Sequence, residues 1–466
     1  MTPTLESLAI CFQGLLPAQL YTCSSDGIPN AAYLSHVDYV DSEHVALSFQ
    51  FFNKSRRNIA ENPQALVNVI DTDTGQGWSL RLHYVRSETS GPLFDRMALR
   101  IEAIASYCNL KGIFKLRAAD IYRVLSIAQM PEETGAVRPE FSQHTGVLDP
   151  VFTVKALQDL SARIHGAETL ESLVDSILAG LEESFGFKQS MILVPTEHEG
   201  VLVTIATRGY PENGAGAEMR YGEGIGGMVA EARKPIRISG LMRGMLYALA
   251  MAKAAQNPDA RRAARRVPVP GLANPESQLG VPLMVRGELV GVLVLESEVP
   301  YRFHEEDKAT IELLGSYLAI AIQNMQMQED QAEPEPAPPV ASRQQPVPSV
   351  AAPAPNHSVN PRAITYYADD ECLLVDGDYL IRGLPAKVLW RLLTIRESTG
   401  RHEFTNRELR LDKSLNLPEW KDNLESRLIL LRRRLEQKCP DIRLAPRCRG
   451  RFVLEVSRPV TLTSHP

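Results

Sequence analysis

The sequence predicts a multidomain fold, with a strand-rich segment first, an α+β segment in the middle, and helices with a terminal hairpin last. The chain has 466 residues, and about 100–200 residues per domain corresponds to about three domains. Residues 329–361 hold nine of the 32 prolines and no aromatic residue, so we expect an extended, mobile linker there. Both strand-like runs and helical patterns occur in residues 1–130 and 151–328. In residues 362–458, leucines at helical spacing are the most prominent pattern.

The composition is that of an ordinary globular protein. Hydrophobic residues make up 44% and charged residues 23%, and the formal net charge is −6, so any DNA-binding surface must be local. The six cysteines form no CxxC pair and show no metal-ligand spacing. The first residues lack a basic segment followed by an apolar core, and no run of about 18 apolar residues occurs. We therefore expect a cytoplasmic protein without a signal peptide, a membrane helix or a metal site.

The first segment, residues 1–130, is predicted to be mostly strands. A short helix to about Phe12 precedes them, and two further helices are expected from Lys54 to Pro63 and at Pro92–Ser106. The strands are expected at Ala18–Cys23, Asn30–Ser35, His44–Phe49, Ala65–Asp71, Trp78–Glu88 and Ala119–Leu125. His36 and His83 are expected to be structural rather than catalytic.

This segment contains two motifs, SxDGxPxxxYLS from Ser24 and NKSRRNxxxNP from Asn53, and the helix start in the second indicates a phosphate site. Backbone N–H groups at the start of a helix attract anions, and nearby lysine and arginine strengthen that field. Both motifs resemble the FMN-binding split barrel of the pyridoxamine-phosphate oxidase family. The resemblance implies FMN and a set of cofactor-binding residues: Ser48, Gln50, Asn53, Lys54, Ser55, Arg56 and Arg57. The alternative is a split barrel without flavin that serves as a dimer platform.

The middle segment, residues 151–328, combines helices with a strong β-hairpin. Helices are expected at Thr153–His165 and Glu168–Phe185, a hairpin at Leu279–Ser297, and a last helix from Glu305 to about Gln328. This pattern resembles a GAF domain, which implies an antiparallel sheet flanked by helices, a small-molecule ligand of unknown identity, and dimerisation through the terminal helices. The histidines at 165, 198 and 304 are alternative haem ligands, although lone histidines are more often structural.

The last segment, residues 362–458, starts with strands at Ile364–Tyr367, Cys372–Val375 and Tyr379–Ile381. A helix follows from Pro385, and Thr405 with Glu408 forms a capping box for a second, short helix. A third helix is expected from Glu419 to about Lys438, because leucines at 424, 428, 431 and 435 form one apolar stripe. The final stretch, IRLAPRCRGRFVLEV, predicts a hairpin with arginines at its tip.

A local basic surface accompanies the third helix and the hairpin. From Lys421 to Arg451 there are ten basic and four acidic residues, a balance of about +6 within an acidic chain. The words LPAKVLWRLL, FTNRELR, DNLESRLILLRRRLEQ and RCRGRFVLEV resemble the OmpR-like winged-helix domain of bacterial response regulators. The resemblance implies double-stranded DNA as partner, with the third helix presenting its arginine and asparagine flank outward. The implied DNA-binding residues are Lys421, Asn423, Ser426, Arg427, Arg433, Arg434, Arg447, Arg449 and Arg451. The alternative is a solvated basic face.

These segments together predict a cytoplasmic, homodimeric sensory regulator of transcription, modulated by a flavin or another small molecule. A linker of about 33 residues transmits no torque, but it can set the local concentration of the last segment or let that segment be sequestered. The alternative is a flavin-dependent oxidoreductase with a regulatory GAF domain, which no constellation of catalytic residues favours.

Overall fold

The computed structural model describes most of the chain as two compact units. The units are Met1–Ala162 with Leu178–Ala319, and Arg163–Ile177 with Ile320–Pro466. The described residues are 3–13, 18–50, 53–71, 76–113, 115–131, 150–196, 198–210, 214–254, 270–300, 302–331, 361–415, 424–448 and 450–466. The predicted linker at 329–361 therefore lies almost wholly outside the described residues.

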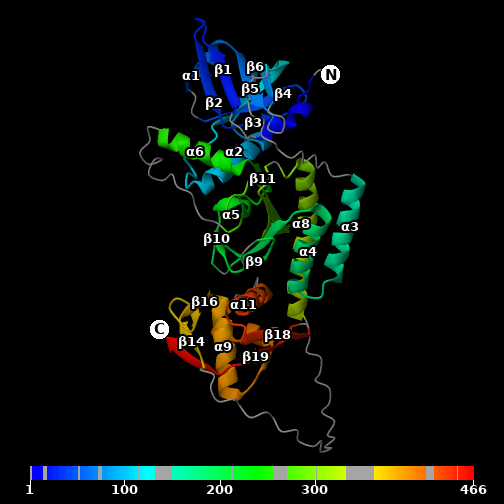
Figure 1. The fold of residues 1–466 in the computed structure, drawn as a ribbon, viewed down its shortest axis with the longest axis vertical. Helices are drawn as coiled ribbons and strands as arrows, with labels where there is room; N and C mark the ends of the chain where they lie inside the picture. Colours follow the sequence, from blue (N-terminus) through cyan, green and yellow to red (C-terminus); the bar gives the residue numbers. More distant parts are fainter. Residues whose placement is uncertain are drawn as a thin grey trace, which may run out of the picture. The chain divides into compact units, whose positions relative to one another are not determined.

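The first segment forms a seven-stranded antiparallel sheet in the order β2-β1-β5-β6-β7-β4-β3 (Figure 1). Its strands are β1 (Ala18–Cys23), β2 (Pro29–Leu34), β3 (Val37–Tyr39), β4 (His44–Phe49), β5 (Gln64–Ile70), β6 (Gly77–Glu88) and β7 (Ala118–Gln129). The expected strands are confirmed to within a residue or two, except that β7 is longer and the short β3 was not expected. Val45, Val67, Leu80 and Leu82 fill the core under this sheet.

Three helices accompany this sheet: the 3-10 helix η1 (Glu6–Gln13), α1 (Asn53–Glu61) and α2 (Pro92–Tyr107). Gly91 precedes α2 with φ +102°, a conformation that favours glycine, and Pro92 then occupies the first turn. Along α2, Met97, Ile101 and Ala105 are buried at a spacing of four residues. The helix thus carries an apolar face that must pack against another part of the molecule.

The middle segment forms a six-stranded antiparallel sheet in the order β10-β9-β8-β13-β12-β11. Its strands are β8 (Gln189–Pro195), β9 (Val201–Arg208), β10 (Glu218–Arg220), β11 (Ile236–Ser239), β12 (Ser277–Val285) and β13 (Glu288–Ser297). The expected hairpin is confirmed as β12–β13, where Arg286 (φ +51°) and Gly287 (φ +83°) form the two-residue turn. The helices are α3 (Pro150–Gly166), α4 (Leu170–Phe185), α5 (Gly224–Ala232), α6 (Leu241–Ala254) and α8 (Glu305–Gln331).

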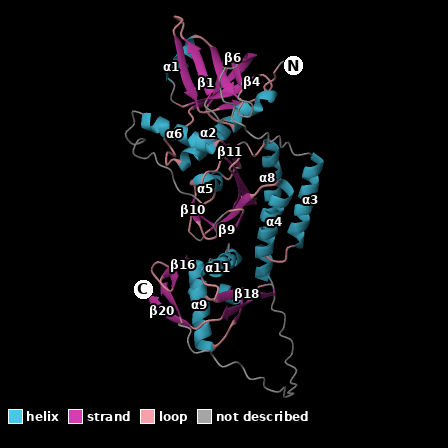
Figure 2. Ribbon diagram, viewed as in Figure 1, coloured by secondary structure: helices cyan, strands magenta, loops and turns pink. Residues whose placement is uncertain are grey.

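Helix α2 of the first segment packs into the middle segment. It contacts α5, α6 and β11, and Figure 2 shows α2 beside α6. Met97 and Ile101 share one buried cluster with Ile225 of α5 and Met245 of α6. Gly244 permits this close packing, because a Cβ there would lie 3.3 Å from carbons of Ile104. The two segments therefore have a continuous hydrophobic core.

The described residues of the last segment form two sheets and three α-helices. One sheet has the order β16-β15-β14-β20, in which β14 and β20 are parallel, and the other has the order β17-β19-β18. The strands are β14 (Arg362–Tyr367), β15 (Cys372–Val375), β16 (Asp378–Arg382), β17 (Glu403–Thr405), β18 (Ile442–Cys448), β19 (Arg451–Val456) and β20 (Val460–His465). The helices are α9 (Leu384–Thr399), α10 (Asn406–Leu411), α11 (Leu424–Lys438) and the short η2 (Lys413–Leu415).

Two details of this segment bear on the sequence predictions. The expected capping box is confirmed, because the Thr405 side chain accepts from the Glu408 N–H and the Glu408 side chain accepts from the Thr405 N–H. Strand β20 was not expected, and it lies beyond the predicted boundary at residue 458. No helix within the described residues is long and apolar enough to cross a membrane.

Candidate functional site

Near the start of α1, where the sequence predicts a phosphate site, several polar side chains are buried, and two of them have hydrogen-bond partners. Ser48, Gln50 and Ser55 are all buried. The Ser48 hydroxyl lies 3.0 Å from the Ser35 hydroxyl, and Asn30 Nδ2 donates to Ser55 Oγ at 2.9 Å. Lys54 and Arg57 are exposed, and the side chain of Asn53 lies outside the described residues. Of the predicted cofactor-binding residues, Ser48, Ser55 and Arg56 line one small cavity.

Arg56 occupies the space beside this group. Its guanidinium lies over the Phe49 ring, 4.3 Å from the centroid. Burial raises the pKa of Asp120, while Ser87, which donates to it at 2.5 Å, and the positive charge of Arg56 partly offset that rise. The cavity enclosed here has a volume of about 20 Å³. That volume holds about one water-sized group, so the described residues of a single chain do not enclose a flavin ring.

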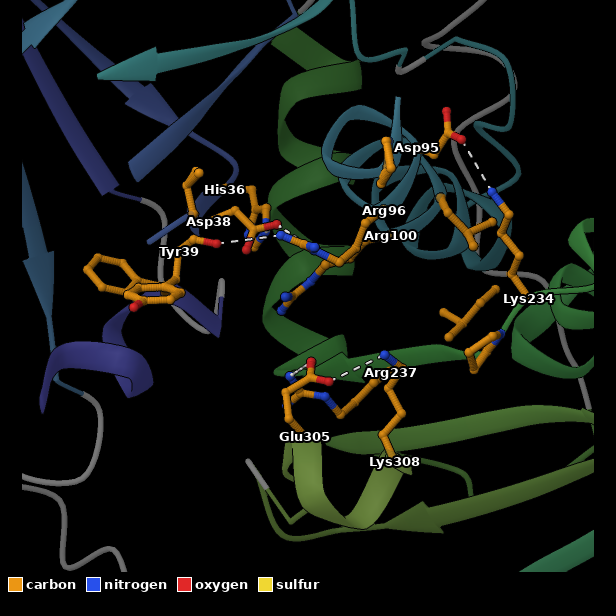
Figure 3. Close-up of a pocket in the computed structure, with 16 residues that line it drawn as sticks. His36, Asp38, Tyr39, Asp95, Arg96, Arg100, Lys234, Arg237, Glu305 and Lys308 are labelled. Atoms are coloured by element: carbon orange, nitrogen blue, oxygen red, sulfur yellow. Dashed lines mark hydrogen bonds and ion pairs between the residues drawn. The ribbon is translucent and has the colours of Figure 1, made fainter. Parts of the chain in front are cut away.

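A much larger cavity lies between the first and middle segments, with a volume of about 560 Å³. Figure 3 shows charged side chains converging on it from β3, α2, β11 and the start of α8. Its ionisable lining residues other than Tyr39 are His36, Asp38, Asp95, Arg96, Arg100, Lys234, Arg237, Glu305 and Lys308. This volume falls within the range of about 300–1,000 Å³ that is typical of small-molecule sites.

On the α2 side of this cavity, Arg96 Nε donates to Asp38 Oδ2 at 3.1 Å. Burial lowers the pKa of His36, and the charge of Arg100 lowers it further, so the imidazole is neutral at neutral pH. Burial alone would raise the pKa of Asp38, but contacts with His36 and Arg96 outweigh it and hold that pKa below its usual range. Among the described residues, His36 Nδ1 is buried without a hydrogen-bond partner.

On the opposite side, the cations come from the middle segment. Arg237 pairs with Glu305 at 2.7 Å and donates to the Phe303 carbonyl oxygen at 2.9 Å. Lys308 lies 3.3 Å from a second oxygen of Glu305. Lys234 lies 3.3 Å from Asp95 Oδ2 of α2, so one ion pair already bridges the two sides. The cavity wall is therefore a network of cations and carboxylates that can exchange partners.

A buried hydrogen-bond chain also joins α2 to the middle sheet. The Tyr107 hydroxyl donates to Gln278 Oε1 at 2.7 Å and accepts from the Ile225 N–H at 3.0 Å. Gln278 in turn donates to the carboxylate of Glu296, which also accepts from the Leu272 N–H at 2.7 Å. Burial raises the pKa of Glu296, although these hydrogen bonds partly offset the rise. The chain locks the end of α2 onto β12 and β13.

In the second unit, α11 differs from the expectation that its arginine flank faces outward. Ser426, Arg427 and Arg433 are all buried. Arg433 donates to Asp175 of α4 at 2.6 Å, and the neighbouring Arg432 donates to Glu171 of α4 at 3.0 Å. Asp175 therefore holds Arg433 of this flank against α4, and Glu171 does the same for Arg432 beside it.

The other predicted DNA-binding residues differ in their exposure. Arg434 is half-buried and donates to the Leu380 carbonyl oxygen at 3.2 Å. Arg447 and Arg451 are exposed on the β18–β19 hairpin, close to its Gly450 turn. Lys421, Asn423 and Arg449 lie outside the described residues. Within the described part of the chain, no cluster of three or more His, Cys, Asp or Glu side chains could hold a metal ion.

The middle segment has the sheet and flanking helices that its sequence resemblance implied. The family model described as GAF domain matches residues 167–323. Residues 167–323 form a GAF domain. The GAF domain supports a sensory or regulatory role for the chain, and the family match does not extend to the first or last segment.

Solved structures similar to this chain include GAF domains and FMN-binding proteins. The GAF domain of a phosphoenolpyruvate-protein phosphotransferase from Coxiella burnetii is 23% identical with a TM-score of 0.30, covering 39% of this chain and 98% of that chain. A free methionine-R-sulfoxide reductase from Neisseria meningitidis is 17% identical with a TM-score of 0.30, covering 38% and 91%. An FMN-binding protein from Syntrophomonas wolfei is 16% identical with a TM-score of 0.23, covering 28% and 89%. No curated protein matches the chain.

Sequence reasoning missed the residues that the fold brings together from distant positions. Tyr107 and Gln278 are hydrogen-bonded across 171 positions of sequence, and Arg100 and Lys308 line one cavity from different segments. Only Glu296 left a local signal, because a carboxylate at the end of the apolar run LVGVLVLE is unusual in a central strand.

Proposed function

We propose that this protein is a sensory regulator that binds double-stranded DNA through residues 361–466 and whose DNA binding depends on the GAF domain. The observation that carries the proposal is the pairing of Arg432 and Arg433 of α11 with Glu171 and Asp175 of α4. Guanidinium groups that bind carboxylates are equally suited to bind phosphates, because both anions accept two parallel N–H donors. The carboxylates of α4 thus take the place that DNA phosphates would take.

This pairing supports a two-state regulator. In the paired state, α11 is sequestered and its arginines are neutralised by α4. In the released state, the same arginines join Arg447 and Arg451 of the hairpin as one basic surface. A signal in the GAF domain needs only to change the free energy of the paired state to change the affinity for DNA.

The proposal is tested by measuring the binding of full-length protein to mixed genomic DNA fragments at low salt. Replacing the exposed Arg447 and Arg451 by alanine should weaken binding and lower the salt slope by about one per lost phosphate contact. The matched control is Arg86→Ala with Lys188→Ala, which removes the same charge from exposed positions of the first unit. Equal affinities for the two double variants would remove the support for DNA binding through the hairpin.

Flavin remains a second candidate for the sensed molecule. The start of α1 carries the exposed cations Lys54 and Arg57, which support a phosphate there, and FMN is the ligand that the sequence resemblance implies. The enclosed volume of about 20 Å³ argues against a flavin ring held within one chain. The visible spectrum of the purified protein decides, because bound FMN gives characteristic flavin bands. No observation specifically favours an oxidoreductase activity.

The proposed regulator is a homodimer joined through α8. Leu313, Tyr317 and Ile320 are exposed at a spacing that places them on one face of this helix, whereas Leu314 is buried. An exposed apolar stripe is typical of a protein interface, and a second copy presents the same stripe in a two-fold arrangement. Tyr317→Lys should therefore lower the mass measured by sedimentation equilibrium. Ile28→Lys, at another exposed apolar position, should leave the mass unchanged.

A further inference from the structure

We propose that the cavity of about 560 Å³ between α2 and the GAF domain binds a small molecule that carries two or more anionic groups. The inference deepens the small-molecule half of the proposed function and rests on that half alone. It does not depend on DNA binding.

The cavity lining carries more positive than negative charge. Five cations line the cavity, namely Arg96, Arg100, Lys234, Arg237 and Lys308, against the three carboxylates Asp38, Asp95 and Glu305. With a neutral His36, the balance is about +2 in a space that is partly shielded from water. An anion is attracted to such a site more strongly than to an open surface, because the surrounding protein screens the interaction less than water does.

The cations of the cavity lie on two different parts of the chain. Arg96 and Arg100 lie on α2, whereas Arg237 and Lys308 come from β11 and α8 of the GAF domain (Figure 3). A single anionic group contacts only the cations near it, whereas a volume of about 560 Å³ has room for a larger ligand. Two anionic groups separated by a short scaffold would each meet one wall, so the cavity favours dicarboxylates, tricarboxylates or phosphate-bearing metabolites over a simple ion.

The cavity lining includes a buried polar atom, His36 Nδ1, that has no hydrogen-bond partner among the described residues. The His36 residue is 4% exposed. A buried unpaired polar atom costs free energy, and bound water or a ligand commonly satisfies it. A hydroxyl or an acid hydrogen of a ligand could donate to this nitrogen. The cavity also offers Val40 and Leu99 as apolar contacts for a carbon scaffold.

A ligand in this position would change the link between the two segments. It would compete with Asp95 for Lys234 and with Glu305 for Arg237 and Lys308, which are ion pairs between residues that line the cavity. Glu305 starts α8, so a ligand that releases its partners acts directly on the helix that leads out of the GAF domain. The site is therefore placed to report a metabolite to the rest of the chain.

The test is calorimetric titration of the full-length protein with inorganic pyrophosphate and, separately, with citrate. Saturable binding of one probe per chain is expected, and the preferred probe tells whether the ligand carries phosphate or carboxylate groups. Arg100→Gln and Lys308→Gln should each weaken binding by about tenfold, because each removes a charge-assisted contact. Lys188→Gln, which removes the same charge from an exposed position outside the cavity, should bind like the parent protein.

Two results would overturn the proposal: no saturable binding of either probe, or the same affinity in both cavity variants as in Lys188→Gln. Circular dichroism of each variant shows whether it is folded. If Arg100→Gln does not fold, Lys308→Gln decides, because Lys308 lies in the first turns of α8 and is only half-buried. A rise in the melting temperature of the parent protein with pyrophosphate or citrate gives an independent readout. The calorimetric titration contains no DNA, so a negative result in it does not affect the result of the DNA-binding test.

Discussion

The pairing of α11 with α4 gives a quantitative prediction about DNA affinity. In the double variant Glu171→Gln with Asp175→Asn, the two α4 carboxylates that pair with Arg432 and Arg433 are neutralised, while Arg432 keeps Glu425 of α11 at 3.5 Å. The two arginine side chains are each 10% exposed, whereas Glu171 is 29% and Asp175 is 60% exposed. Solvent screens the Asp175 pair more, so the Glu171 pair should contribute the larger share.

The magnitude follows from these exposures. Ion pairs with one solvent-exposed partner contribute about 0.5–1 kcal/mol each, so the double variant should destabilise the paired state by about 1–2 kcal/mol. If the paired state holds most molecules, that loss raises the apparent affinity for DNA by about 5–30-fold. Fluorescence anisotropy with a labelled duplex at about 50 mM salt measures the change, because phosphate contacts are strongest at low salt.

The control for this experiment is Glu182→Gln with Glu183→Gln. It removes the same charge from the same helix, and Glu182 pairs with Arg208 rather than with α11. The control therefore separates release of α11 from a general gain in attraction to DNA. Equal affinities for the two double variants would refute the reasoning, and so would unchanged amide hydrogen exchange in Leu424–Lys438.

Three further predictions concern the joint between α2 and the GAF domain. Tyr107→Phe removes the hydroxyl that bridges Gln278 and Ile225, so the free energy of unfolding should fall by about 1–3 kcal/mol in urea denaturation, whereas Tyr33→Phe at an exposed site should change it by less than about 0.5 kcal/mol. Met97→Ala should lower the free energy of unfolding by about 2–5 kcal/mol. Signals that report on the GAF domain and on α2 should show one common unfolding transition, and two separate transitions would contradict a shared core. Because burial raises the folded-state pKa of Glu296, the unfolded state releases this proton first, and the free energy of unfolding should fall as the pH rises from the ordinary glutamate range toward the raised pKa. Glu296→Gln should flatten that slope, and an unchanged slope in the variant would show that another group causes it.

Local chemistry allowed much of the fold to be predicted from the sequence. Arg286 and Gly287 between two apolar runs specify a two-residue turn, and the β12–β13 hairpin follows. Thr405 and Glu408 specify the start of α10 because each side chain caps the other residue's backbone. In both cases, the residues that determine the structure lie within a few positions of each other.

Nonlocal pairing could not be predicted in the same way. Strand β20 (Val460–His465) is stabilised by parallel pairing with β14, almost a hundred residues earlier, and its short run VTLTSH lies beyond the boundary that the sequence predicts for this segment. The orientation of α11 was missed for a related reason. Periodicity identifies the apolar stripe, but it does not tell whether distant carboxylates such as Glu171 turn the polar flank inward.

The candidate cavity was beyond sequence reasoning altogether. His36, Arg100 and Lys308 are each unremarkable in their own neighbourhoods, and only the packing of α2 against the GAF domain places them around one space. Sequence motifs instead directed attention to the start of α1, where the structure encloses little room.

The continuous core across α2 and the GAF domain also constrains how such a protein can be taken apart. A gene fragment that begins at α3 would encode the whole matched GAF region and yet leave Ile225 and Met245 without the apolar face that covers them. Water would meet that face, and the fragment would be prone to self-association. A sensory fragment intended for fusion to other proteins therefore has to include the strand-rich first segment together with α2.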